Sequence, residues 1–301
     1  MAQFRCLEFP NTTGVSMCRF IAYTGEPILM DELLYAPNNS LILQSYKAKE
    51  REEPLNGDRF GVGWYTPEVD PFPGVFKSIT PACSNQNLRH LATKIRSRCF
   101  FAHVRAATHG IPVMEVNCHP FMAGWLLWMH NGQVGGFPLL KRKLINLLSE
   151  DRYATIQGTT DSEHAFALFL DFLGKREGTA MLYQMKIAMS KTLATLARLA
   201  RDNNIAETSF LDFCVSNGDD PIAVRYVSDP SKNPASLYCS EEGSYRLIGG
   251  EARLVDTVTS DHAVIVSSER LTDRPKDWNV IPQNHLVMID RNLTVKTEPL
   301  T

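Results

Sequence analysis

Residues 16–24 read Ser-Met-Cys-Arg-Phe-Ile-Ala-Tyr-Thr, a cysteine at the head of a run of β-favouring residues. This run predicts a short strand over 18–24 that ends at Gly25. If translation starts at Met17, or if the first 17 residues are removed, Cys18 becomes an N-terminal cysteine. Its α-amine, whose ordinary pKa is about 7.7–8.0, could then accept the proton of its own thiol. One residue at the start of one strand would hold both a nucleophile and its base.

The composition excludes several classes of protein. The chain has 301 residues, is 44% hydrophobic and carries a net charge of −2, so it can bury a large core as one large domain or two modest ones. It has no basic excess for nucleic acid and no apolar run of the roughly 20 residues that a membrane span needs. Arg5 and Glu8 interrupt the start, which therefore lacks a secretory signal. We expect a soluble, cytoplasmic protein that binds neither nucleic acid nor membrane.

The cysteines and histidines form no ligand pattern. The seven cysteines include no CxxC pair, and the eight histidines include no HxxxH or HxH pair. The sequence therefore predicts no zinc site, no disulfide framework and no other metal or cofactor.

Hydrophobic periodicity predicts strands on both sides of a central group of helices. Helices are expected at 86–97, 138–149, 161–173 and 179–202, the last with Met181, Met185, Ile187, Leu193 and Leu196 near one face. Strands are expected at 18–24, 60–65, 99–105, 125–130, 211–216, 222–228, 236–240, 262–267 and 284–290. Prolines predict a loop over 66–74, and Asn131-Gly132 predicts a tight turn. This order favours a layered α+β domain over a doubly wound sheet.

Three further clusters could carry chemistry, and each also has a structural interpretation. Arg105 ends a buried strand; its planar guanidinium suits a carboxylate, or it forms a structural ion pair. The amide of Asn131 and the backbone N–H of Gly132 could converge on an oxyanion, or form a β-turn. Asp161 precedes an apolar helix, where it could bind an ammonium group or serve as an N-cap or first-turn carboxylate.

Taken together, these residues resemble the class II glutamine amidotransferases, which are N-terminal-nucleophile hydrolases. The shared pattern is Cys18-Arg19, Arg105-x-x-Thr108-His109-Gly110, Asn131-Gly132 and Thr160-Asp161-Ser162-Glu163, in this order and spacing. The resemblance implies a four-layer αββα sandwich in a single domain over 18–301. It also implies that residues 1–17 are an extension, either a misassigned upstream start or a propeptide that is removed.

The resemblance also implies a role for each residue of the pattern. Cys18 matches the nucleophile, and Asn131 and Gly132 match the oxyanion hole. Arg105 matches the group that binds the α-carboxylate of glutamine. Asp161 matches the partner of its α-ammonium, while Thr108 and His109 line the same pocket.

Other segments are similar to a narrower group, the amidotransferase-like subunit of the DUG-type glutathione degradosome. They include Asn56-Gly57-Asp58, residues 76–82, residues 117–121 and Ser268-Glu269-Arg270-Leu271. This similarity implies hydrolysis of a γ-glutamyl amide through a cysteinyl thioester, with glutathione or glutamine as the substrate. It also implies a separate metallopeptidase-like partner subunit.

Three alternatives remain open at this point. They are the γ-glutamyl hydrolase of ergothioneine-type biosynthesis, a glutaminase that supplies ammonia in trans, and a non-catalytic scaffold that binds γ-glutamyl compounds. Two residues depart from the family pattern. Ala106 stands where the larger synthase-linked amidotransferases have tryptophan, and Arg59 stands where relatives usually have glycine.

Overall fold

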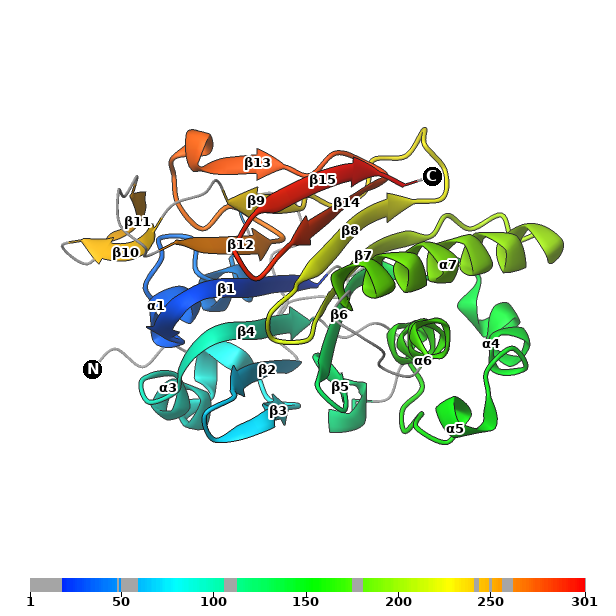
Figure 1. The fold of residues 1–301 in the computed structure, drawn as a ribbon, viewed down its shortest axis with the longest axis horizontal. Coiled ribbons are helices and arrows are strands. Elements are labelled where there is room, and N and C mark those ends of the chain that lie inside the picture. The colour runs from blue at the N-terminus through cyan, green and yellow to red at the C-terminus, as the bar shows by residue number, and fades with distance from the viewer. Residues whose placement is uncertain are drawn as a thin grey trace.

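Two antiparallel sheets lie face to face at the centre of the structure (Figure 1). It is a computed structural model, and it describes residues 18–47, 49, 59–105, 113–174, 181–240, 244–248, 251–255 and 262–300. The seven-stranded sheet has the order β13-β9-β12-β1-β4-β2-β3, and the six-stranded sheet the order β15-β14-β8-β7-β6-β5.

The strands of the first sheet are β13 (Trp278–Val280), β9 (Tyr238–Ser240), β12 (Ala263–Ser267), β1 (Arg19–Leu29), β4 (Arg96–Arg105), β2 (Arg59–Thr66) and β3 (Asp70–Ser78). Those of the second are β15 (Val295–Pro299), β14 (His285–Ile289), β8 (Ile222–Val227), β7 (Phe210–Ser216), β6 (Leu126–Gln133) and β5 (Phe121–Ala123). The hairpin of β10 (Ser244–Ile248) and β11 (Glu251–Val255) pairs separately.

Alternation along the strands explains why helices cover both outer faces. In β1, Phe20 and Ala22 belong to the core between the sheets, while Ile21 and Tyr23 belong to an outer core. Successive side chains of a strand point to opposite faces, so a strand that is apolar on both faces needs a cover on each side. β6 shows the same alternation, with Leu127 facing the other sheet and Trp128 facing the helices on the opposite side.

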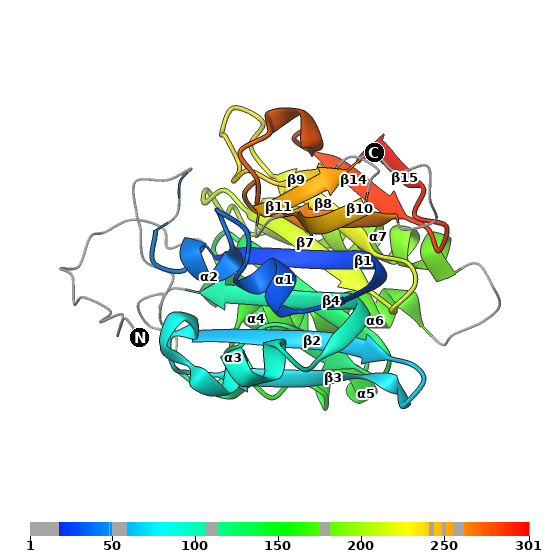
Figure 2. The ribbon, with the colours of Figure 1, turned by 90° about the vertical axis from the view of Figure 1, so that its left-hand side faces the viewer.

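The helices supply these two covers (Figure 2). On the seven-stranded sheet lie α1 (Asp31–Leu34), α2 (Leu41–Gln44) and α3 (Gln86–Ala92). On the six-stranded sheet lie α4 (Phe137–Ile145), α5 (Glu150–Tyr153), α6 (Asp161–Leu173) and α7 (Met181–Asp202). Short 3-10 turns occur at Ala82–Ser84, Glu115–Asn117 and Pro275–Asp277. The predicted α+β sandwich with four layers is confirmed.

Five local predictions were wrong. The strand predicted to end at Gly25 continues as β1 to Leu29. The predicted loop over 66–74 contains the start of β3, because an edge strand can hold prolines whose missing N–H would face away from the sheet. Asn131-Gly132 is not a turn but part of β6, paired with β7. The helix predicted to reach residue 97 ends at Ala92, and its last residues instead begin β4. Ile187 of α7 is exposed.

Within the described ranges, every helix is too short or too polar to cross a bilayer.

Replacing Phe169 of α6 by alanine should test the helical layer. Phe169 is fully buried, with its ring centroid 5.2 Å from that of Trp128. Its truncation should lower the free energy of unfolding by about 3–5 kcal/mol. Leu139→Ala on α4, where the leucine is 70% exposed, is the control and should change it by less than about 0.5 kcal/mol. Urea unfolding would measure both, and equal effects would contradict this packing.

Candidate active site

The strand ends of the seven-stranded sheet bring the cysteine and three arginines together. In the register of the sheet, Arg19 lies opposite Val104, and Arg59 lies opposite Arg105. Cys18, directly before β1, therefore lies at the same end of the sheet as the end of β4 and the start of β2. Arg59, where a glycine was expected from the family resemblance, is 1% exposed and begins β2. It adds a third buried arginine to this end of the sheet, besides Arg19 and Arg105.

Charges surround the Cys18 thiol. Burial raises its pKa, while Arg105, Arg19 and Arg59, in decreasing order, lower it. Asp161 raises it by its negative charge. Arg105 and Asp161 thus act on the same sulfur although they come from different layers of the fold. A buried thiol with a raised pKa needs a base to become a nucleophile.

A buried ion pair fixes the backbone at Cys18. Arg19 Nε donates to Glu269 Oε1 at 2.8 Å, and Arg19 Nη1 donates to the carbonyl oxygen of Cys18 at 3.0 Å. Glu269 also accepts from Asn39 Nδ2 at 3.3 Å and from the backbone N–H of Lys49 at 3.1 Å. Glu269 belongs to one of the family-like segments of the sequence, but no role was expected for it or for Asn39.

Asn131 and Gly132 lie on β6, in the facing sheet. Asn131 is 1% exposed, and its Nδ2 lies 3.5 Å from Asp212 Oδ2 on β7. Gly132 has φ +133°, and a Cβ added there would lie 1.9 Å from the carbonyl oxygen of Phe210. Its backbone therefore requires glycine, because a side chain would meet β7 directly.

Asp161 joins the end of β6 to the start of α6. Its Oδ2 accepts from the backbone N–H of Val134 at 2.8 Å, and its Oδ1 accepts from that of Ser162 at 2.8 Å. The N-cap of α6 is Thr160, whose side chain accepts from the N–H of Glu163. Asp161 is therefore a first-turn carboxylate, and its oxygens retain lone pairs for a further donor.

Three buried histidines complete the site. The rings of His103 and His119 stack with centroids 4.2 Å apart. His103 Nε2 lies 3.1 Å from the carbonyl oxygen of His130, which links β4 to β6 beside Asn131. Burial, assisted by Arg105, lowers the pKa of His103 to about 3, and burial lowers that of His119 well below its usual range. No role was expected for His130 from the sequence.

Two predicted pocket residues, Thr108 and His109, lie outside the described residues, as does Ala106. The structure thus brings Cys18, Arg105 and Asp161 together and places Asn131 and Gly132 on the strand that faces them. No cluster of three or more His, Cys, Asp or Glu side chains suited to a metal ion occurs among the residues that the structure describes.

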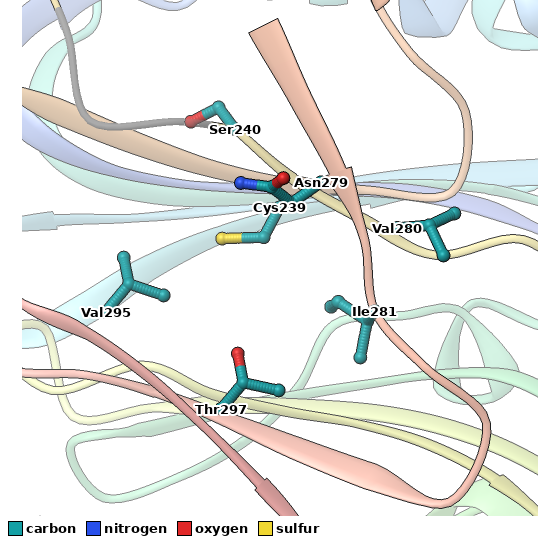
Figure 3. Close-up of a pocket in the computed structure, with 7 residues that line it drawn as sticks. All are labelled: Cys239, Ser240, Asn279, Val280, Ile281, Val295 and Thr297. Carbon is teal, nitrogen blue, oxygen red and sulfur yellow. The ribbon is translucent and has the colours of Figure 1, made fainter. Parts of the chain in front are cut away.

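A separate cavity of about 420 Å³ lies between the edges of the two sheets (Figure 3). It is lined by Cys239, Ser240, Asn279, Val280, Ile281, Val295 and Thr297. These residues come from β9, β13 and β15 and from the segment after β13, at the opposite edge of the sandwich from β3 and β5. Burial raises the pKa of the Cys239 thiol to about 12, so this cysteine is a protonated thiol at neutral pH.

The chain is similar to known proteins in sequence and in fold. Residues 36–239 match the family described as glutamine amidotransferases class-II. The chain is 37% identical, over 94% of its length and 84% of the relative's, to the probable glutamine amidotransferase DUG3 of Saccharomyces cerevisiae. It is 35% identical to the gamma-glutamyl-hercynylcysteine sulfoxide hydrolase of Mycolicibacterium smegmatis, over 41% of this chain and 55% of that protein.

Solved structures share the fold. A glutamine aminotransferase class-II domain protein from Silicibacter pomeroyi matches with a TM-score of 0.63 and 24% identity, over 94% of this chain and all of that one. The glutamine phosphoribosylpyrophosphate amidotransferase of Bacillus subtilis matches with a TM-score of 0.58 and 16% identity, over 94% of this chain and 49% of that one.

Gly132→Ala tests the strained position at the end of β6. The new Cβ would meet Phe210 O, and φ would be unfavourable, so we expect a loss of about 3 kcal/mol or more in unfolding free energy. Gly124→Ala is a matched control: φ is +57° there, but no atom lies within 4 Å of the added Cβ. It should cost only about 1–2 kcal/mol. Chemical denaturation of both variants would measure the difference, and equal losses would contradict the contact with Phe210.

Proposed function

This chain belongs to the class II glutamine amidotransferases, and we propose that it hydrolyses a γ-glutamyl amide bond through a thioester on Cys18. The observation that carries the proposal is the convergence on one buried thiol of Arg105 from β4 and Asp161 from α6. A γ-glutamyl group has an α-carboxylate and an α-ammonium, so it needs one cation and one anion at a fixed distance from the nucleophile. The named relatives are enzymes, which favours catalysis over the scaffold alternative.

In the proposed mechanism, residues 1–17 are absent and Cys18 has a free α-amine. The amine accepts the thiol proton, and the thiolate attacks the γ-carbonyl carbon. The side-chain amide of Asn131 and the backbone N–H of Gly132 donate to the tetrahedral oxyanion. The leaving amine takes the proton as the C–N bond breaks, which leaves a γ-glutamyl thioester. Water then attacks the thioester, glutamate departs, and the thiol is restored.

The substrate contacts follow from the same charges. Arg105 would bind the α-carboxylate through its planar guanidinium, and Asp161 would accept from the α-ammonium. Thr108 and His109 would line the pocket on the segment that follows β4. Glutathione is the proposed substrate, and cysteinylglycine is the leaving group. The proposed compartment is the cytoplasm, and the proposed partner is a metallopeptidase-like subunit. The similarity to DUG3 and to a gamma-glutamyl compound hydrolase supports this choice.

A comparison of substrates would test the choice. Faster hydrolysis of glutathione than of glutamine is expected. Preference for glutamine would instead favour a glutaminase that supplies ammonia in trans. Preference for a larger γ-glutamyl sulfoxide would favour a hydrolase of the ergothioneine type.

The N-terminus is the sharpest test of the mechanism. Protein that begins at Cys18 should be active, whereas protein that retains residues 1–17 should not, because an amide nitrogen at Cys18 is no base. Cys18→Ala in the shortened protein should abolish turnover and leave the unfolding midpoint close to that of the parent. N-terminal mass spectrometry of protein from its native source should find Cys18 first. Full activity with an intact Met1 would overturn this mechanism.

Arg105→Lys should raise KM for a γ-glutamyl substrate about 10- to 100-fold, because an ammonium cannot reproduce two parallel hydrogen bonds to a carboxylate. Arg98→Lys is the control, since Arg98 lies exposed on the same strand. Steady-state kinetics would measure both variants. An unchanged KM for Arg105→Lys would mean that Arg105 is structural.

A further inference from the structure

The ring of His130 lies between α6 and β7, next to the residues of β6 that are proposed to bind the oxyanion. Its Nε2 lies 3.3 Å from the carbonyl oxygen of Phe210, and its Nδ1 lies 2.8 Å from Ser162 Oγ. The same Ser162 Oγ lies 3.3 Å from Asp161 Oδ1. A Cβ added at Gly132 would lie 3.2 Å from His130 Nε2, so the ring also lies against the oxyanion glycine.

The acceptors around this ring determine where its proton lies. A carbonyl oxygen can only accept, so Nε2 must carry the proton that is donated to Phe210. Burial lowers the pKa of His130, which favours the neutral ring with a single N–H. Nδ1 is then an acceptor, and the Ser162 hydroxyl donates to it. The shorter of the two Ser162 contacts is the one to His130, in agreement with this direction.

This direction has a consequence for Asp161. The Ser162 hydroxyl has one proton to donate. Because it donates that proton in a hydrogen bond to His130 Nδ1, it cannot donate to Asp161 Oδ1 at the same time. Each carboxylate oxygen of Asp161 then accepts one backbone N–H, from Val134 or from Ser162. The remaining lone pairs can accept from an ammonium group.

We propose that His130 is a positioning residue for the α-ammonium of the substrate: its Nδ1 accepts the hydrogen bond of the Ser162 hydroxyl and so keeps Asp161 open as an acceptor. This inference rests on the proposed γ-glutamyl function and adds to it a reason for selecting substrates that have an α-ammonium group. Without the Nδ1 acceptor, the Ser162 hydroxyl turns to Asp161 and competes with the substrate ammonium.

Two substitutions separate the contacts of the ring. His130→Asn can place a side-chain carbonyl near the position of Nδ1 and so retain the acceptor for Ser162. His130→Gln can place an amide N–H near the position of Nε2, which retains the donor to Phe210 but loses that acceptor. The readout is the ratio of the affinities for L-glutamate and glutarate, which differ only in the α-amine, measured by calorimetry on protein that begins at Cys18.

We expect the ratio to fall about tenfold in His130→Gln and to stay within about threefold of the parent in His130→Asn. Adding Ser162→Ala to His130→Gln should restore the ratio, because it removes the competing hydroxyl. Equal losses in the two His130 variants, or no restoration by Ser162→Ala, would overturn the inference. A parent protein that does not distinguish glutamate from glutarate would overturn it as well.

A spectroscopic measurement on the unmodified ring covers the case in which a variant does not fold. Nitrogen-15 NMR of the histidine rings should show His130 with a protonated Nε2 and an unprotonated Nδ1. A proton on Nδ1 would overturn the proposal.

Catalytic activity is measured separately. A parent protein that selects glutamate over glutarate but hydrolyses no γ-glutamyl amide would refute the proposed reaction and not the role of His130. An active parent whose His130→Gln variant keeps its selectivity would refute that role alone.

Discussion

The ion pair between Arg19 and Glu269 is the interaction on which the geometry of the site depends. Both side chains are almost fully buried, and they are 250 residues apart in the chain. A buried charge is costly unless it is paired and hydrogen-bonded, so neither residue is stable at its position without the other. Because Arg19 also donates to the carbonyl oxygen of Cys18, the pair fixes the residue that carries the thiol. The ladder beside it continues through Phe20 and Ser268, which exchange two hydrogen bonds.

The rest of the site follows from how the two sheets meet. β1, β4 and β2 bring three arginines to one end of the first sheet, and β6 brings an amide and a glycine to the second. Two contacts hold the site together, one between the sheets and one between the end of β6 and α6. His103 Nε2 reaches the carbonyl oxygen of His130 across the sheets, and Asp161 accepts from the backbone of Val134 just after β6. Three arginines and one aspartate act on the Cys18 thiol, so positive charge is in excess around it. Such an excess suits a substrate with a free carboxylate.

Periodicity predicted a layered α+β domain because central strands such as β1 are apolar on both faces, as at Phe20 and Ile21. The four-layer arrangement was expected only from the family resemblance. Periodicity failed where an element depends on its neighbours. Pro71 and Pro73 are tolerated in β3 only because that strand is at an edge. Asn131-Gly132 has the composition of a turn, yet β7 pairs with it and β6 continues to Gln133. The positive φ of Gly132 is accommodated within the sheet rather than at a hairpin.

The amino-acid sequence by itself determined the reactive groups and their order along the chain: a cysteine before a strand, an arginine at the end of another, an amide with a glycine, and a carboxylate before a helix. These are properties of residue type and spacing, which local patterns contain. Only the tertiary structure decided the partners of these groups. Glu269 beneath Arg19, Arg59 beside Arg105, and His130 between Phe210 and Ser162 are set by strand register and burial. Such contacts join residues from distant parts of the chain, and their energies depend on desolvation, which local sequence does not specify.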